Sequence, residues 1–272
     1  MEPQPDKLQR LVDVHRLVDA HAHICEPDFD RDRVEVLERA RKAGIGAIIA
    51  VGEDLCDARK NVQLAAAYPM LKAAAGLYPT ILDPDQADAM VGFVVQHRLH
   101  LIAIGEVGLD YRAVTEDSQK ALQREIFKRF IELSLALDLP LNIHSRSAGR
   151  HAIALLLENN AVRVQMHAFD GKAAAAFAAV EAGYFFSIPP SVIRSRQKQK
   201  LVKQLPLACL LVETDSPVLG PDPTARNEPS NIFIAVEAIA QIKSIPVEVV
   251  VETVAENTNR LYGELCHVEN KS

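Results

Sequence analysis

An aspartate and two histidines alternate in the stretch VDAHAH, residues 18–23. Side chains two residues apart point to the same side of a β-strand but to different faces of a helix. Asp19, His21 and His23 would therefore project together from a strand. Imidazole nitrogens bind zinc and neighbouring metals, so the two histidines are candidate metal ligands. A single pair with this spacing also arises by chance at a strand end, and the rest of the chain must decide between the two interpretations.

Residues of the kinds that bind divalent metals also follow other apolar stretches. They are Glu106 in IGEVGL, His144 in LNIHS, His167 in VQMHAF and Asp215 in LLVETDS. Carboxylates suit magnesium and manganese as well as zinc, and a carboxylate can bridge two ions. The remaining histidines lie before strands, in helices or in the tail, and we expect them to be surface or packing residues: His15, His97, His100, His151 and His267.

Eight short stretches rich in aliphatic and β-branched residues have the composition of strands. Segments between them carry apolar residues at helical spacing with few breakers, which predicts helices at 31–43, 119–137, 148–160 and 172–182. The predicted strands are 16–23, 46–52, 71–79, 101–109, 139–145, 162–169, 183–189 and 208–217.

Regular alternation of eight strands with helices predicts a (β/α)₈ barrel of the TIM type, with a doubly wound open sheet as the alternative. The carboxyl ends of all strands open at one face of such a barrel, so the candidate ligands should converge there. No Gly-, Ser- or Pro-rich linker divides the chain, and we expect one domain over 1–272, with a core of about 16–263 and frayed ends. The Pro-dense segment 216–229 is expected to be a long active-site loop.

Composition and charge narrow the classes of function. Hydrophobic residues make up 49% of the 272 and charged residues 24%, values typical of a globular protein. A net charge of −6 argues against a broad basic surface that coats nucleic acid. A phosphate substrate is still allowed, because two divalent ions held by neutral histidines and two carboxylates leave positive charge in a pocket.

The sequence also bears on cellular location. No apolar run approaches the length of a membrane span, and the first ten residues lack a signal-peptide pattern. We therefore expect an intracellular protein that does not contact a membrane. The four cysteines have no CxxC spacing and are expected to be free thiols.

From VDAHAH through IGEVGLDYR, NIHSR, MHAFDG and VETDSP to RNEPSNI, the sequence resembles the TatD-type metal-dependent deoxyribonucleases. Each motif alone is weak, but their order and spacing are specific. The resemblance implies two divalent metal ions held by six ligands: His21, His23, Glu106, His144, His167 and Asp215.

The same resemblance implies a role for each ligand. Glu106 bridges the two ions, and the histidines of NIHSR and MHAFDG bind the second ion. Asp215 binds the first ion with the two histidines of VDAHAH, and it orients or deprotonates the attacking water. Asp19 and Glu213 each lie two residues from a ligand on the same strand face, so we expect them to fix the orientation of imidazole rings.

The chain departs from the family pattern at the edge of the expected pocket. Many relatives have GIHPH where this chain has GLYPT, so Tyr78 and Thr80 stand where histidines are usual. MHAFDG likewise replaces the commoner HCFSG. Because the six expected ligands are unchanged, hydrolysis is expected to be kept while substrate positioning differs.

Three arginines follow predicted strands and could bind phosphate through paired N–H groups: Arg112, Arg146 and Arg226. Each could instead pair with a surface acid, and we favour phosphate binding for Arg146, which is two residues from a candidate ligand. The basic run RSRQKQKLVK, residues 194–203, is expected to be a solvated helix face, with guidance of a nucleic-acid end as the alternative. Cys25 is expected to be a buried thiol rather than a further ligand.

These observations predict a hydrolase that cleaves phosphodiester bonds by water attack at two divalent ions, either zinc, magnesium or manganese. The resemblance implies DNA ends as the substrate and attack from the 3′ end, and no obligate protein partner is evident. An amidohydrolase or lactonase could use nearly the same ligands, but many of that class have a carboxylated lysine where this chain has Glu106. A barrel that had lost turnover would be expected to lack a ligand, and none is missing.

Overall fold

The computed structural model describes residues 17–266. Residues 1–16 and 267–272 lie outside the described part. The expectations for His15 and His267, and most of the expectation for the two chain ends, therefore concern residues that the structure does not describe. Within residues 17–266, no helix is both long enough and apolar enough to cross a bilayer.

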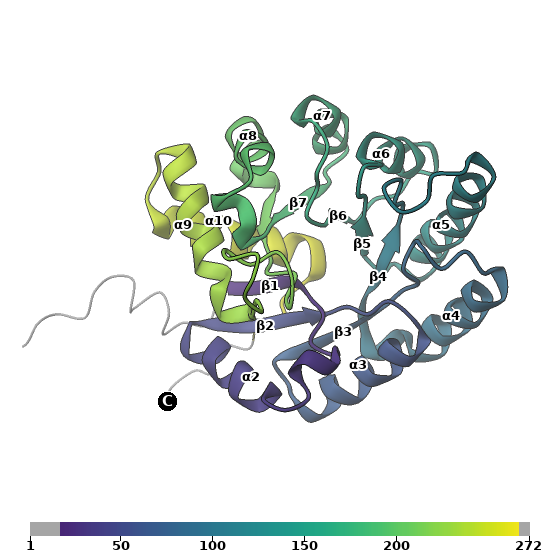
Figure 1. Cartoon of the computed structure of the whole chain (residues 1–272), viewed down its shortest axis with the longest axis horizontal. Helices are drawn as coiled ribbons and strands as arrows, with labels where there is room; N and C mark the ends of the chain where they lie inside the picture. Colours follow the sequence, from purple (N-terminus) through teal and green to yellow (C-terminus); the bar gives the residue numbers. More distant parts are fainter. Residues whose placement is uncertain (1–16, 267–272) are drawn as a thin grey trace, which may run out of the picture.

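Eight parallel strands stand side by side in chain order, surrounded by helices (Figure 1). Behind β8 the chain rejoins the first strand, because the N–H of Asp215 donates to the carbonyl of His21 at 2.8 Å and the N–H of His23 donates to that of Ser216 at 2.8 Å. The (β/α)₈ prediction is confirmed, and the sequential strand order excludes the doubly wound alternative. The strands are β1 (Leu17–Ala22), β2 (Ile45–Ala50), β3 (Leu71–Ala75), β4 (Leu101–Gly108), β5 (Leu141–His144), β6 (Val164–Met166), β7 (Phe185–Ile188) and β8 (Leu210–Val212).

The helices follow the strands as predicted, and the four ranges expected from sequence each agree to within two residues with α2, α5, α6 and α7. They are α2 (Arg33–Lys42), α3 (Leu55–Ala67), α4 (Pro84–His97), α5 (Asp117–Leu137), α6 (Gly149–Glu158), α7 (Ala173–Glu181), α8 (Arg196–Gln204), α9 (Ile232–Lys243) and α10 (Val247–Tyr262). Short 3₁₀ turns occur at η1 (Pro27–Phe29), η2 (Arg98–His100), η3 (Pro190–Ile193), η4 (Leu207–Cys209) and η5 (Pro229–Asn231).

Local sequence explains where several helices begin. The side chain of Asp54 accepts two backbone N–H groups in the first turn of α3, and Asp83 does the same for α4, which starts with a proline. Ser195 accepts the N–H of Lys198 at the start of α8. These side chains satisfy N–H groups that have no partner within the helix, and so they fix the first residue of each helix.

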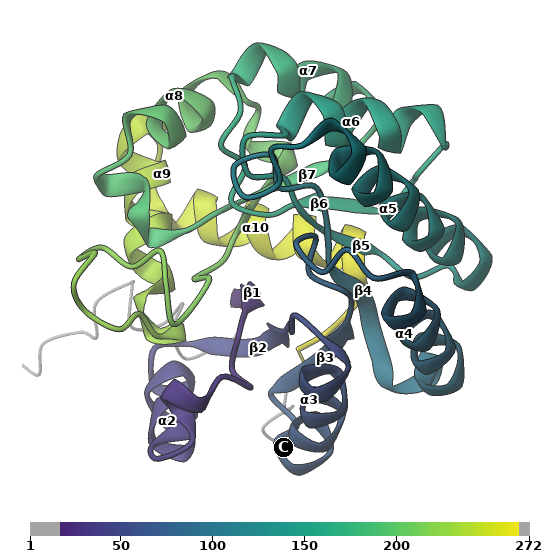
Figure 2. The ribbon, with the colours of Figure 1, turned by 45° about the vertical axis from the view of Figure 1, so that its right-hand side comes forward.

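Apolar side chains fill two spaces. One cluster lies between the strands and the surrounding helices and includes Phe127, Phe130 and Ile131 on the inner face of α5. A smaller cluster lies inside the barrel and includes Val18 and Ile49. Leu261 and Tyr262 of α10 belong to the inner cluster, and α10 crosses one end of the barrel instead of joining the outer ring (Figure 2). The barrel is therefore plugged at the amino ends of its strands, which leaves the opposite mouth for chemistry.

Candidate metal centre

The six candidate ligands meet at the carboxyl ends of the strands, and all six are buried. His21 lies in β1, Glu106 in β4 and His144 at the end of β5, while the other three lie one to three residues beyond a strand. Residues spread over almost two hundred positions are therefore brought into one cluster. The six are His21, His23, Glu106, His144, His167 and Asp215.

The strand ladder is irregular where two of these ligands occur. The register between β1 and β2 shifts between Asp19 and Ala22, and the register between β4 and β5 shifts between Ile104 and Val107. Such irregularities turn a side chain away from its regular direction and are common beside active sites. Both His21 and Glu106 lie within the shifted segments.

A first set of four ligand atoms has the spacing of a metal site. His21 Nε2 lies 3.3 Å from His23 Nε2, 3.7 Å from Glu106 Oε2 and 3.5 Å from Asp215 Oδ1. His23 Nε2 lies 3.4 Å from the same Glu106 oxygen and 3.6 Å from the same Asp215 oxygen. Zinc–ligand bonds of about 2.0–2.1 Å in a tetrahedron place ligand atoms about 3.3–3.4 Å apart, so a divalent ion fits among these four atoms.

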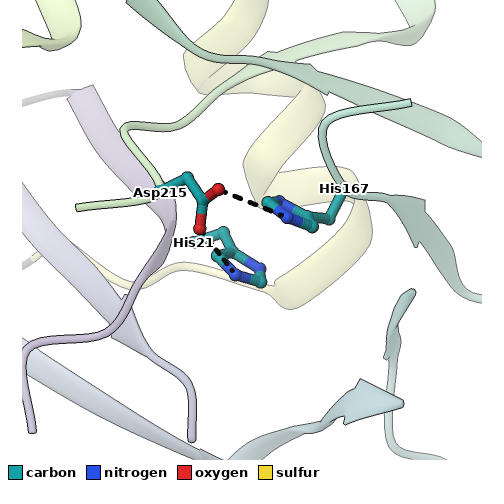
Figure 3. A group of neighbouring side chains, drawn as sticks. All are labelled: His21, His167 and Asp215. Carbon is teal, nitrogen blue, oxygen red and sulfur yellow. Dashed lines mark ion pairs between the residues drawn. The ribbon is translucent and has the colours of Figure 1, made fainter. Parts of the chain in front are cut away.

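The second set uses the other oxygens of the same two carboxylates. Glu106 Oε1 lies 2.6 Å from His144 Nδ1 and 3.7 Å from His167 Nε2, and Asp215 Oδ2 also lies 3.7 Å from His167 Nε2. The 2.6 Å contact is a hydrogen-bond distance, so this pair must separate by roughly 0.7 Å for both atoms to bind one tetrahedral ion. In Figure 3 dashed lines join the Asp215 carboxylate to His21 and to His167, whose rings stack with centroids 3.5 Å apart.

Three of the imidazoles are held by an acceptor at the nitrogen that faces away from the ligand sets. His21 Nδ1 lies 2.8 Å from Asn142 Oδ1, His167 Nδ1 lies 2.9 Å from Glu213 Oε2, and His144 Nε2 lies 3.0 Å from Asp110 Oδ2. Histidines that bind metals almost always have such a partner, which fixes the ring and the tautomer. His23 Nδ1 has no partner among residues 17–266.

Burial and neighbouring charges set the protonation of the ligands. Burial lowers the pKa of His21 to about 3, so the ring is neutral, as a metal ligand must be. Burial raises the pKa of Asp215 to about 6. Burial alone would also raise the pKa of Glu106, but His144 and its hydrogen bond hold that pKa well below its usual value. A negatively charged Glu106 is the form that two cations would share.

Comparison with known proteins agrees with this geometry. A family model described as TatD related DNase matches residues 18–263. The chain belongs to the TatD-related DNase family. It is 47% identical over 267 residues to the Homo sapiens protein named Deoxyribonuclease TATDN3, covering 94% of this chain and 97% of that protein.

More distant TatD relatives extend the comparison to bacteria. The Bacillus subtilis protein YabD, named an uncharacterized metal-dependent hydrolase, is 32% identical, with 90% of this chain and 98% of that protein covered. The crystal structure of the Escherichia coli TatD homologue YJJV superposes with a TM-score of 0.85 at 26% identity, covering 92% of this chain and 99% of that chain. The predicted TatD-type hydrolase is therefore confirmed at the level of the family.

The two orienting residues expected from sequence behave differently in this TatD barrel. Glu213 accepts from His167 as described above, and its other oxygen accepts the N–H of Ala168 at 2.9 Å. Asp19 contacts neither imidazole ring among the described residues. Its carboxylate accepts instead from the backbone N–H of Thr214 at 2.8 Å, from the Thr214 hydroxyl and from the backbone N–H of His21 at 3.3 Å. The partners of Asp19 thus differ from the imidazole contact expected from sequence, because its short side chain reaches the segment after β8 and ties that segment to β1.

Sequence reasoning missed Asn142 and Asp110, which orient His21 and His144. Asn142 lies two residues before His144 on the same strand, so the rule that suggested Asp19 and Glu213 also applied to it. Gln165, two residues before a ligand on β6, joins the same buried polar layer. Its amide nitrogen donates to Ser187 Oγ at 2.8 Å, and its amide oxygen accepts from the Tyr262 hydroxyl at 2.6 Å. This layer separates the ligand sets from the apolar plug below.

A cavity of about 550 Å³ opens onto the ligand sets. Tyr78 lines it, with its ring edge-on to His144 at 4.9 Å between centroids, whereas Thr80 is exposed and does not line it. The departure from the family pattern at GLYPT therefore changes one cavity wall through Tyr78. Glu53 and Asp170 add acidic groups to the rim.

Of the three arginines, only Arg146 lines this cavity. It pairs with Asp110 through Nη2 at 2.8 Å. Arg226 forms an ion pair of 2.6 Å with Asp32, the alternative considered from sequence, and Arg112 is exposed. Neither of these two is near enough to line the cavity. Cys25 is buried, and its thiol donates to the carbonyl of Val51.

We expect Asp110→Asn to weaken metal binding at the second ligand set. The Oδ1 atom of Asp110 accepts the N–H groups of Arg112 and Ala113, and an asparagine can keep both contacts. The new amide N–H₂ would then face the donors of His144 and Arg146, which now share Oδ2. Loss of an orienting partner typically lowers metal affinity or activity by about 10–100-fold.

Metal titration measures this effect, and Arg146→Met is the matched control for metal affinity because it removes the ion pair and leaves the contact between Asp110 and His144. An Asp110→Asn protein with parental metal affinity would show that the contact does not orient the ring.

Proposed function

We propose that this TatD protein, as a single-domain barrel, hydrolyses phosphodiester bonds of DNA with two divalent ions bound by the six ligands. The observation that carries the proposal is that two carboxylates, Glu106 and Asp215, each belong to both ligand sets. Each of Glu106 and Asp215 directs one oxygen to the first set and the other oxygen to the second, at 3.4–3.7 Å from imidazole nitrogens apart from the shorter contact with His144. Carboxylates shared in this way are the basis of sites for two ions.

His21 and His23 would hold one ion and His144 and His167 the other, with Glu106 shared between them. Ions bound there would polarise a phosphate oxygen and lower the pKa of a water molecule. Asp215 would accept the proton of the attacking water, because its carboxylate is buried at the site and directs one oxygen to each ligand set. Zinc, magnesium and manganese are each compatible with nitrogen and oxygen ligands.

The substrate is inferred from charge, size and family. Two divalent ions outweigh the two carboxylates that bind them, so the site attracts anions despite the chain's net charge of −6. A cavity of about 550 Å³ is in the range of small-ligand pockets and admits a strand end more readily than a duplex. The deoxyribonuclease name of the Homo sapiens relative makes DNA the leading substrate. We propose digestion from the 3′ end, which the resemblance of the motifs implies.

Linear and covalently closed circular single-stranded DNA of one sequence provide the test. We expect the linear molecule to be digested at least about tenfold faster, and chelation to abolish digestion. If few phosphates contact the site, as the proposal requires, activity should fall only modestly with salt, because the salt dependence scales with the number of phosphates neutralised. The lengths of the products of an end-labelled strand, followed over time, show from which end the strand is digested.

The same preparation is also assayed with zinc, magnesium and manganese in turn, and with an ester and an amide as alternative substrates. Rapid cutting of the circle would contradict action at ends. Hydrolysis of the ester or amide without hydrolysis of DNA would identify the protein as an amidohydrolase or lactonase instead.

A further inference from the structure

The basic run at residues 194–203 is not uniform. Four of its cations are exposed: Arg194, Arg196, Lys200 and Lys203. Lys198 is different, with only 7% of its surface exposed, and it is the only buried lysine or arginine within residues 17–266. It packs on the same face of α8 as Leu201 and Val202, which are also buried. The run is therefore a solvated helix face with one cation turned inward.

Lys198 lines the cavity that holds the candidate metal ligands. Its Nζ donates to the carbonyl oxygen of Ala168 at 2.7 Å, next in the chain to His167. An ammonium group has three N–H donors, and the carbonyl uses one. Among residues 17–266 this nitrogen forms no ion pair with a carboxylate, and the Ala168 carbonyl is its hydrogen-bond partner, so two donors and the positive charge have no protein partner at the cavity wall.

A buried ammonium without a paired acid is costly, because burial removes its hydration without replacing it. Burial accordingly lowers the pKa of Lys198, although Glu213, Asp170 and Asp215 act in the opposite direction. Arg146, the other cation that lines the cavity, forms an ion pair with Asp110, and 47% of its side chain is exposed. Lys198 is thus the cation of the cavity that lacks a protein partner for its charge.

We propose that Lys198 binds a phosphate oxygen of the substrate held at the metal centre. This inference rests on the proposed phosphodiester hydrolysis and adds a phosphate contact that the family motifs did not indicate. A phosphate oxygen accepts charge-assisted hydrogen bonds from an ammonium group and supplies the negative charge that the buried Lys198 lacks.

A structural role is the competing explanation, because α8 also anchors the loop that follows His167. The amide of Gln197 donates to the carbonyls of Phe169 at 3.3 Å and Gly171 at 2.6 Å, beside the carbonyl bound by Lys198. Gln197→Ala therefore loosens the same loop without removing a charge. Lys200→Ala removes one charge from the same helix at an exposed position.

The experiment measures binding of inorganic phosphate by calorimetry, together with KM and kcat on a single-stranded oligonucleotide, for the metal-loaded full chain. Metal content and Tm are recorded for every variant. Lys198→Met and Lys198→Gln should weaken phosphate binding by about 10–100-fold and raise KM, in line with the strength of hydrogen bonds to charged groups. Lys198→Arg should recover part of the loss, and Gln197→Ala and Lys200→Ala should change phosphate binding by less than about threefold.

Three results would overturn the assignment. In the first, Lys198→Met and Lys198→Gln bind phosphate as tightly as Lys200→Ala does. In the second, Gln197→Ala weakens phosphate binding as much as the two Lys198 variants. In the third, the two Lys198 variants lose bound metal in proportion to their loss of phosphate binding. If the parent protein binds phosphate through Lys198 but leaves DNA intact, the proposed nuclease function fails and the phosphate contact stands. If the parent cuts DNA and the neutral variants bind phosphate normally, only the Lys198 assignment fails.

Discussion

Asp215→Asn is expected to lower turnover by about 10²–10⁴-fold, the range lost when a general base is removed. An asparagine can still offer an oxygen to a metal ion through its amide, but it cannot accept a proton from water. Metal content should therefore fall much less than turnover. Metal analysis and kcat on the same preparation separate the two effects.

The backbone at this position favours an intact fold in the variant. Asp215 has a φ of 55°, in the left-handed region that few residues other than glycine, asparagine and aspartate adopt readily. Its N–H bonds the carbonyl of His21 and helps to close the barrel. Asparagine suits this conformation, so Tm should change little. Asp215→Ala is the comparison variant, since it loses both the oxygen ligand and the favourable conformation, and it should lose more metal and more stability.

A rate close to that of the parent would show that Asp215 is not the base. Glu213, two residues before Asp215, could not take over as the base, because its carboxylate is already occupied. It accepts from His167 at 2.9 Å, from Ser187 at 2.5 Å and from the N–H of Ala168. The amide of Gln165 is a fourth donor, at 3.4 Å. A carboxylate held by four donors orients its neighbours and has little capacity to take a proton from water.

The fold was predictable because the signals that specify it are local and repeated. Each strand is a short apolar run, and each helix has apolar residues at helical spacing. The alternation of the two favours a barrel and leaves only the doubly wound sheet as an alternative, which the strand order excludes. The six candidate ligands were predictable for a related reason. They end strands, and a parallel barrel brings all strand ends to one mouth, so their position in each unit predicted their convergence without knowledge of any contact.

The contacts around the ligands were not predictable in the same way. Asp110 lies two residues after β4 and contacts His144 at the end of the neighbouring strand, β5. A contact between two strands is not indicated by residue spacing within either one. Asp19 and Glu213 have the same offset from a ligand, yet only Glu213 contacts an imidazole, because the direction of a side chain depends on which neighbour it meets. Lys198 was hidden inside a run of charges. Its spacing of three and four residues from Leu201 and Val202 was the available signal.

Glu106→Gln is expected to lose more metal and more activity than His23→Ala. Glu106 Oε2 lies 3.4 Å from His23 Nε2 and Oε1 lies 2.6 Å from His144 Nδ1, so this one side chain belongs to both ligand sets. The glutamine keeps one oxygen, carries no charge and presents N–H groups to the other set. We expect it to bind fewer than one ion per chain and to lose about 10³-fold or more in turnover, because activation by metal ions supplies several kcal/mol.

His23→Ala removes an atom of the first set alone, so it should keep the ion bound by His144 and His167 and lose at least about tenfold less activity than the glutamine variant. Asp170→Asn is the matched control, since it removes one acidic charge from the same cavity outside both sets, and it should retain the parental metal content. Elemental analysis and turnover under a series of free metal concentrations measure all three proteins. If Glu106→Gln and His23→Ala each lost a single ion and equal activity, Glu106 would belong to one ion only, and the shared carboxylate on which the two-ion proposal rests would be disproved.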